Sequence, residues 1–397
     1  MTKYVNHDLK LENSNSELAR QTFMLSMRSY VMLNMASGMK QLYENKVEPN
    51  FKKNNKRKPR NGDEIHKTIK NETFFKFYSS IRCNTQEMSF RSVLPPIEKS
   101  LESLTIKAKK LSKSKKVKGS LKIKNNFEIP KNVSSLDVHL MPGCYHTEYS
   151  KDDISQGAIY DNGVSVFSMG LFGKDLDDIG QSISLFVKSK YPKFKPNKIL
   201  DLGCTIGHNT LPWGSTYPNS EIHAVDVGAP VLRYGNARAQ SKGIPVNFHQ
   251  QNAENLSFES SSFDLVFSSM FLHEVPKKGI TNILKEAYRV LKPGGMMIHM
   301  ELPPNGMLEP YDSFYLDWDS YYNKEPYYKI FRDLKPLDIC KNAGFKNKNF
   351  FNFIIPSLGQ YGAKVIKDSA KINITKADDQ TGRFTKGIHW YCFGAWK

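Results

Sequence analysis

The chain of 397 residues is 39% hydrophobic and 12% aromatic, which is enough apolar material for a sizeable core and for two domains. Its start lacks the charged and apolar regions of a secretory signal, and no stretch approaches the roughly 20 apolar residues of a membrane span, so we expect a cytoplasmic protein. The five cysteines are far apart, with no pair at Cys-x-x-Cys spacing. This spacing argues against a disulfide framework and against a structural zinc site.

Two basic segments account for most of the net charge of +18. Residues 51–60 carry six positive charges and residues 107–124 carry nine lysines, and neither segment contains an acidic residue. Basic segments with few aromatic residues are usually solvated linkers, and we favour that interpretation. A tether to RNA or to another anionic surface is the alternative.

Helices are predicted in the first third of the chain, at residues 16–43, 74–81 and 97–111. The first carries an apolar stripe with a spacing of seven residues, formed by Leu18, Leu25, Met32 and Met39. We expect this stripe to pack in a core, and a membrane-surface or cofactor role is the less favoured alternative. A homodimer through the N-terminal helices is a separate hypothesis. Because the composition changes near residue 130, residues 1–135 are predicted to be a helical region with basic linkers that helps to close a site or forms a dimer.

Residues 140–173 are predicted to be a long irregular segment, rich in glycine and in polar aromatic side chains. A loop of this length inside a domain is usually functional or disordered. Its aromatic content argues against disorder, so we expect it to contribute to a binding site.

The chain alternates between strands and helices from residue 198 onward. Strands are predicted at residues 198–200, 221–225, 246–250, 263–268, 296–301, 349–355 and 387–396. The clearest helix between them is at residues 279–291, where the apolar residues fall on one face. Such alternation with short connections predicts an α/β fold with a mainly parallel sheet, whose ligand binds at the carboxyl ends of the strands.

The first of these strands runs into a glycine-containing turn, KILDLGCTIG, at residues 198–207. Glycines let the backbone approach a ligand closely, and the helix that follows offers unpaired N–H groups. Asp226 follows the second strand, 19 residues after Gly207, where a carboxylate can bind the hydroxyls of a ribose. The spacing Gly-x-Gly-x-x-Gly of dinucleotide-binding proteins is absent from this turn.

Five segments of this region carry a family resemblance. In chain order they read ILDLGCTIG, IHAVDV, QQNAENLSF, FDLVFSSMFLHEV and EAYRVLKPGGMMIHMEL. Together they resemble the class I S-adenosylmethionine-dependent methyltransferases, particularly the branch that acts on small molecules and lipids such as quinone and sterol precursors. The resemblance implies a Rossmann-like, seven-stranded, mainly parallel sheet with an antiparallel last strand. It implies a methyltransferase domain at residues 136–397, with its motifs at 198–302 and an acceptor-side insertion at 303–332.

The resemblance also implies where S-adenosylmethionine binds. Asp201 and Gly203 would lie beside its methionine part, Asp226 would hold its ribose, and Asn252 and Ala253 would pass beside its adenine. We assign the same cofactor-binding role to Cys204, Gly207, Val227 and Ser268.

Two residues depart from the family pattern, because Thr205 and Asn252 replace the usual glycine and aspartate. Neither change removes a charge that methyl transfer needs, which agrees with an active enzyme. The Thr205 side chain, however, is expected to narrow the predicted pocket. A non-catalytic scaffold with a vestigial cofactor pocket is therefore one alternative to an enzyme.

His273 is the candidate catalytic residue. Methyl transfer is an in-line displacement that requires no nucleophilic side chain, but a general base helps when the acceptor is a hydroxyl or an acidic carbon. His273 follows the fourth strand, on the side where the resemblance places the methyl group. We favour the alternative that it shapes the loop or contacts the acceptor without taking a proton. Glu274 could orient it, and we predict no metal site.

The acceptor is predicted to be a small or lipid-like organic molecule, methylated on oxygen, carbon or sulfur. The candidate acceptor-binding residues are Tyr145, His146, Tyr160, Trp318 and Tyr322, although ordinary packing would explain each of them equally well or better. An RNA methyltransferase tethered by the basic segments is less favoured, because the catalytic half is nearly neutral and lacks an Asn-Pro-Pro-Tyr motif.

Overall fold

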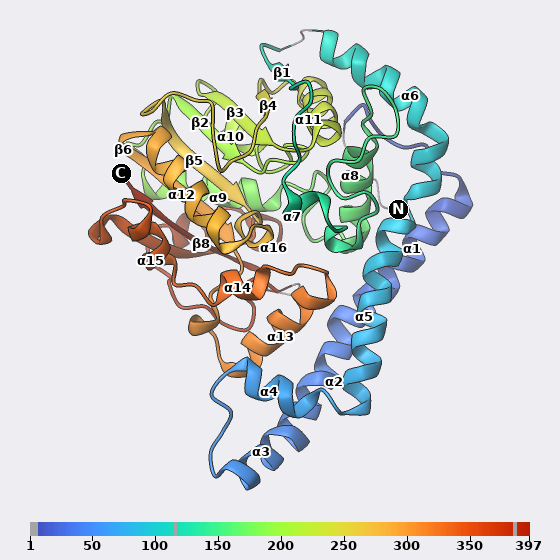
Figure 1. Cartoon of the computed structure of the whole chain (residues 1–397), viewed down its shortest axis with the longest axis vertical. Coiled ribbons are helices and arrows are strands. Elements are labelled where there is room, and N and C mark those ends of the chain that lie inside the picture. Colours follow the sequence, from blue (N-terminus) through green and yellow to red (C-terminus); the bar gives the residue numbers. More distant parts are fainter. Residues whose placement is uncertain (1–6, 115–116, 384–386) are drawn as a thin grey trace.

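The alternating segments after residue 198 form one sheet in the computed structural model, which describes residues 7–114, 117–383 and 387–397 (Figure 1). The strand order is β1-β4-β3-β2-β5-β6-β8-β7, and among the described strands β8 alone runs opposite to the other seven. The strands are β1 (Ser120–Lys122), β2 (Lys198–Leu202), β3 (Glu221–Asp226), β4 (Asn247–Gln250), β5 (Phe263–Ser269), β6 (Leu291–Glu301), β7 (Phe350–Pro356) and β8 (His389–Trp396). The predicted Rossmann-like α/β class, with its antiparallel last strand, is confirmed.

The sheet has one strand more than the seven that we expected. β1 lies in the lysine-rich segment that we interpreted as a linker, and it pairs in parallel with β4. The Ser120 hydroxyl also donates to the side-chain oxygen of Asn247 at 2.8 Å. A strand of three residues is too short for an alternating pattern to predict it. Residues 115 and 116 of this segment, like residues 1–6, lie outside the described residues.

The helices around the sheet cover both of its faces. They are α6 (Leu94–Lys113), α7 (Lys131–Ser134), α8 (Ser155–Phe167), α9 (Asp178–Lys190), α10 (Leu211–Thr216), α11 (Ala229–Lys242), α12 (Lys277–Val290), α13 (Pro310–Tyr322), α14 (Tyr328–Arg332), α15 (Pro336–Asn342) and α16 (Leu358–Ser369). Within the described residues, no helix combines the length and the apolar character that crossing a membrane requires.

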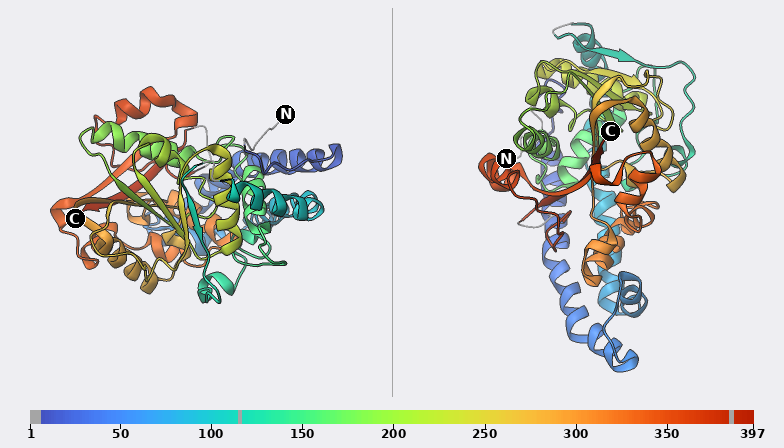
Figure 2. Two further views of the ribbon diagram at one scale, coloured as in Figure 1. Left: turned by 90° about the horizontal axis from the view of Figure 1, so that it is seen from above. Right: turned by 90° about the vertical axis from the view of Figure 1, so that its left-hand side faces the viewer.

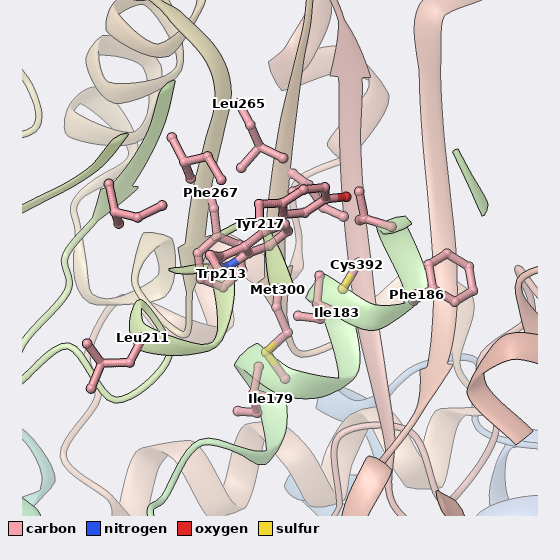
Figure 3. Close-up of a cluster of buried hydrophobic side chains, with 14 of the residues drawn as sticks. Ile179, Ile183, Phe186, Leu211, Trp213, Tyr217, Leu265, Phe267, Met300 and Cys392 are labelled. Atoms are coloured by element: carbon pink, nitrogen blue, oxygen red, sulfur yellow. The ribbon is translucent and has the colours of Figure 1, made fainter. Parts of the chain in front are cut away.

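Apolar cores lie on both faces of the sheet. On one face, Ile183 of α9 and Trp213 of α10 pack near Phe267 of β5 (Figure 3). On the other face, α12 buries its apolar stripe, including Ile280 and Ile283, which confirms the amphipathic helix predicted there. These cores fix the strand ends, and therefore the turns that follow them.

The N-terminal helices form an arm, residues 15–91, that extends beyond the sheet (Figures 1 and 2). Its helices are α1 (Asn15–Ser29), α2 (Met35–Leu42), α3 (Glu48–Asn55), α4 (Gly62–Ile69) and α5 (Thr73–Arg91), with π-helical turns at Tyr30–Asn34 and Tyr43–Val47. At one end of the arm, α1 and α5 contact α8; at the other end, α4 and α5 contact α13. The helix predicted at residues 16–43 is thus present, with one π-helical turn inside it.

Residues 140–173 are more regular than expected, because they contain α8. This helix is buried on nearly all sides, between the arm and α11. A Cβ atom at Gly163 would lie 2.4 Å from the Phe90 ring of α5, and one at Gly157 would lie 2.3 Å from Tyr234 of α11. A helix without a polar face has no amphipathic periodicity, so the sequence pattern did not predict it.

Candidate active site

A cavity of about 600 Å³ lies at the carboxyl ends of the parallel strands. One wall, called the strand side, consists of the turns after β2, β3 and β4. The opposite wall, called the arm side, combines the π-helical turn Tyr30–Asn34 and α2 of the arm with residues around His139, Tyr145, His273 and Glu325. The position agrees with the rule that parallel sheets bind ligands beyond their carboxyl ends.

Five of the nine predicted cofactor-binding residues line the strand side, namely Gly203, Asp226, Val227, Asn252 and Ala253. Asp226 is only 9% exposed. Its two carboxylate oxygens accept hydrogen bonds from the backbone N–H groups of Thr205 and Gly228, both at 2.9 Å. Burial raises the pKa of Asp226 to about 6.

The turn after β2 needs residues that tolerate a left-handed backbone. Gly203 has φ of 71°, and a Cβ atom there would lie 2.4 Å from the ring of Phe271. Thr205 has φ of 46°, a conformation that favours glycine. Thr205 also lines the cavity on its strand side, and the narrowing of the pocket by its side chain stays a prediction.

The other four predicted cofactor residues do not line this cavity. Asp201 is 3% exposed and accepts a hydrogen bond from the Thr210 hydroxyl at 2.6 Å. Burial raises the pKa of Asp201 to about 7. Cys204 accepts a hydrogen bond from the backbone of Gly207 inside the turn, and Ser268 is fully buried. In this geometry Asp201 supports the turn instead of presenting a carboxylate to the cavity.

His273 lines the cavity in the short helical turn Leu272–Glu274 after β5. Its Nδ1 lies 2.5 Å from Oε2 of Glu301, its Nε2 lies 3.4 Å from Oε1 of Glu325, and its ring stacks on Tyr328. Burial lowers the pKa of His273, but the carboxylates of Glu301 and Glu325 outweigh it and raise the pKa to about 10. An imidazole with this pKa is protonated at neutral pH and cannot accept a proton.

Glu274 does not orient His273, contrary to our expectation. Its Oε1 accepts a hydrogen bond from the Tyr145 hydroxyl at 2.8 Å and lies 3.1 Å from Nε2 of His139. The orienting carboxylate is that of Glu301, which also accepts hydrogen bonds from two backbone N–H groups of the loop before His273. Adjacent side chains of this turn point to different partners, which sequence proximity alone does not reveal.

Glu325 is a cavity residue that the sequence analysis missed. Its side chain is 2% exposed, and Oε1 lies between Nε2 of His273 at 3.4 Å and Nδ1 of His139 at 3.7 Å. Its Oε2 is buried without a hydrogen-bond partner among the described residues. No local motif surrounds Glu325, so only the assembled fold brings it to this wall.

The predicted acceptor-binding residues separate into two groups. Tyr145 and Tyr160 line the cavity, with ring centroids 6.0 Å apart. His146, Trp318 and Tyr322 do not. Trp318 is outside the cavity because it lies on α13, which packs against the arm.

Trp318 contacts α5 instead of the cavity. Its indole N–H donates to the Ser79 hydroxyl at 2.8 Å, and its ring lies 4.6 Å from that of Tyr78. Nearby, Arg82 of α5 is fully buried and its Nε donates to Asp319 at 2.6 Å. The insertion at residues 303–332 therefore docks the arm through residues such as Trp318 and Asp319, and it also lines the cavity with residues that include Leu316, Glu325 and Tyr328.

The arm closes the cavity with apolar side chains. Met32 and Leu33 of the first π-helical turn and Ala36 of α2 line the arm side, together with Phe90 of α5 and Phe167 of α8. Among the described residues, no group of histidine, cysteine and carboxylate side chains has an arrangement that could hold a metal ion.

Comparisons with known proteins agree with this geometry. Residues 199–295 match a family model described as a methyltransferase domain. A ubiquinone/menaquinone biosynthesis C-methyltransferase of Vibrio parahaemolyticus is 32% identical over 176 residues, which are 39% of this chain and 66% of the relative. The corresponding enzyme of Pasteurella multocida is 33% identical over 124 residues, or 30% of this chain and 45% of the relative.

The chain spans about half the length of the curated relatives that it matches. For example, a demethylmenaquinone methyltransferase of Thermus thermophilus is 29% identical over 133 residues, which are 34% of this chain and 57% of the relative. Among solved structures, a putative O-methyltransferase from Nostoc punctiforme aligns over 96% of both chains at 12% identity, with a TM-score of 0.42. That likeness is too low to carry an argument.

Proposed function

Because residues 199–295 form a class I S-adenosylmethionine-dependent methyltransferase domain, we propose that this chain transfers a methyl group from S-adenosylmethionine to a small or lipid-like organic acceptor. The observation that carries the proposal is the single cavity that joins the Asp226 turn to an enclosed apolar wall. A volume of about 600 Å³ is within the usual range for sites of small molecules and cofactors.

The strand side fits this cofactor. The Asp226 carboxylate is held by two backbone N–H groups at the end of β3, where its remaining lone pairs can accept hydrogen bonds from ribose hydroxyls. Asn252 and Ala253 line the adjoining wall, where an adenine would pass. Gly203, whose backbone N–H donates to Val225 and whose missing side chain makes room for the Phe271 ring, lines the part of the cavity where the methionine part would lie.

When bound, the cofactor supplies a sulfonium methyl group that is already activated for displacement. The protein then has to align the acceptor and exclude water. We assign alignment to the arm side, where Tyr145, Glu274 and Glu325 offer polar groups among apolar walls. His273 acts in this proposal as a positioning residue: its ion pair with Glu301 fixes the loop after β5, and no proton passes to it.

The charges of the arm favour a small acceptor over RNA. Several cations of residues 51–60 pair with acids of the arm, because Lys52 and Lys58 contact Glu48, and Arg57 contacts Glu64. Paired cations have less charge to offer to phosphates. RNA binding that weakens steeply with salt, together with methylation of RNA, would favour the alternative.

Calorimetric titration of the purified chain with S-adenosylmethionine and S-adenosylhomocysteine tests the donor. Incubation with metabolite extracts and cofactor labelled in its methyl group, followed by mass identification of the labelled product, then tests the acceptor. Binding of both compounds and a labelled small molecule are expected. Absence of cofactor binding would leave the vestigial scaffold as the better description.

A further inference from the structure

We propose that the acceptor is an alkyl amine, whose nitrogen binds the carboxylate of Glu325 and whose apolar body lies against the π-helical turn Tyr30–Asn34 and α2 of the arm. This inference rests on the proposed function and specifies the substrate class of the same cavity.

The first observation is the unsatisfied carboxylate oxygen of Glu325. The residue is 5% exposed, it lines the cavity, and its Oε2 has no hydrogen-bond partner among the described residues. A buried carboxylate without full hydrogen bonding is costly, and a ligand that donates to it removes that cost. The ligand expected here therefore has a hydrogen-bond donor, which an amine supplies.

The second observation is the charge of the surrounding cluster. Three carboxylates, the buried ones of Glu301 and Glu325 and the partly buried one of Glu274, contact two imidazoles, those of His139 and His273. Interaction with Glu325 and Glu274 outweighs burial and raises the pKa of His139, as the pKa of His273 is raised. Even with both imidazoles protonated, the cluster retains a negative charge. A cationic head group is favoured beside it and an anionic one is disfavoured.

The third observation is an apolar wall in the same cavity, which reaches the cluster where the ring of Phe167 lies 6.3 Å from that of His139. Met32, Leu33 and Ala36 line it, together with Phe90 and Phe167. Such a wall stabilises a bound molecule in proportion to the apolar area that it removes from water. Lys40 also lines the cavity, but it is exposed to solvent and its charge is therefore screened.

The chemistry balances for an amine. The bound ammonium first passes one proton to the Glu325 carboxylate, which gives a neutral amine and a carboxylic acid. The nitrogen lone pair then forms the N–C bond as the C–S bond breaks, and the electrons of that bond stay on sulfur. The positive charge thereby moves from sulfur to the methylated nitrogen, beside the remaining carboxylates of the cluster.

The test uses three probes that share an eight-carbon skeleton and differ in head group: octylamine, octanol and octanoate. Each is titrated at pH 7 into the full chain that is saturated with S-adenosylhomocysteine. Octylamine is expected to bind about tenfold or more tightly than octanoate, the effect of one hydrogen bond to a charged group. Octanol reports the contribution of the apolar chain alone.

Glu325→Gln should reduce the affinity for octylamine to that for octanol, because the variant keeps the shape but loses the charge. Glu259→Gln, at an exposed site away from the cavity, is the matched control and should leave all three affinities unchanged. Ala36→Leu should weaken octylamine binding without changing its preference over octanoate, because it fills the apolar wall only.

The outcomes separate this inference from the proposed function. Failure of S-adenosylhomocysteine itself to bind contradicts the proposed function. If S-adenosylhomocysteine binds but octanoate binds as tightly as octylamine, or octylamine does not bind measurably, the amine inference is wrong. It is also wrong if the preference for octylamine survives in a folded Glu325→Gln variant with normal S-adenosylhomocysteine affinity.

Discussion

The strand side of the cavity depends on local backbone contacts, whereas the arm side depends on contacts between distant parts of the chain. Asp226 accepts hydrogen bonds from the backbone of two strand-end turns. Glu274, in contrast, meets Tyr145 and His139, which are 129 and 135 residues away in the sequence. A turn at the end of a strand forms with the sheet, but the arm side forms only when the arm docks. Substitutions on the two sides should therefore separate cofactor binding from acceptor binding.

The largest effect is expected for Glu301→Gln, which breaks the buried pair with His273 on the arm side. Removing one partner of a buried ion pair costs about 3–5 kcal/mol, which denaturant unfolding measures. The raised pKa of His273 means that the pair stabilises the fold fully below the ordinary value near 6.5 and loses this contribution as the pH rises through about 10. The difference between wild type and variant should therefore shrink towards pH 10. A constant difference up to that pH would contradict the ion pair.

On the strand side, Asp226→Ala should weaken S-adenosylhomocysteine binding by about 1–3 kcal/mol, the scale of a hydrogen bond to a charged group. Calorimetric titration measures the change, and Asp338→Ala, at an exposed position, is the matched control. The preference for octylamine over octanoate should stay unchanged in Asp226→Ala if the two sides of the cavity are independent.

The same carboxylate predicts a pH dependence. Because the pKa of Asp226 is raised to about 6, the ionised form that accepts hydrogen bonds dominates above that pH. Cofactor affinity should increase as the pH rises through about 6, and this increase should be absent in Asp226→Asn. An equal increase in that variant would assign the titration to another group.

A smaller effect is expected for Ser79→Ala, at the contact between the arm and α13. The change leaves the buried indole N–H of Trp318 without its partner and should cost about 1 kcal/mol in unfolding free energy. Octylamine binding should weaken while S-adenosylhomocysteine binding stays the same. Ser103→Ala on the exposed face of α6 is the control. Equal weakening of both ligands would contradict the division between the two sides.

The smallest effect concerns the shape of the pH profile. His273→Asn should lower turnover through loss of positioning, but the profile between pH 6 and 8 should keep its wild-type shape, since a protonated His273 does not titrate there. If turnover of the wild type falls at acidic pH and this fall is absent in the variant, His273 is the general base and the positioning role is wrong.

The sequence predicted the sheet and most of the strand side, because their signals are local. Gly203 and Asn252 follow strands and Asp226 ends one, and strand ends in a parallel sheet meet at one edge. Asp201 is the exception on this side. Its position in the motif predicts a contact with the cofactor. In the structure, its carboxylate instead accepts a hydrogen bond from the hydroxyl of Thr210, nine residues later, and the sequence does not show this contact.

The arm side could not be predicted from local patterns. Glu325 and His139 belong to no motif, and their approach to His273 depends on how the insertion and the arm dock. Trp318 shows the opposite case, because an aromatic, acidic helix suits a binding cage and an interface equally well. The burial of α8 removed the periodicity that identifies most helices.

The attachment of the arm at two places limits how an acceptor can enter. The arm is fixed to α8 at one end and to α13 at the other, and the residues that line the cavity lie between these two attachments. A span held at both ends cannot swing aside like a hinged lid. Under the proposed function, an acceptor would therefore enter past its flanks or through bending near the π-helical turn at Tyr30–Asn34. The width of the acceptor at its broadest point would then be a selection criterion separate from the charge of its head group.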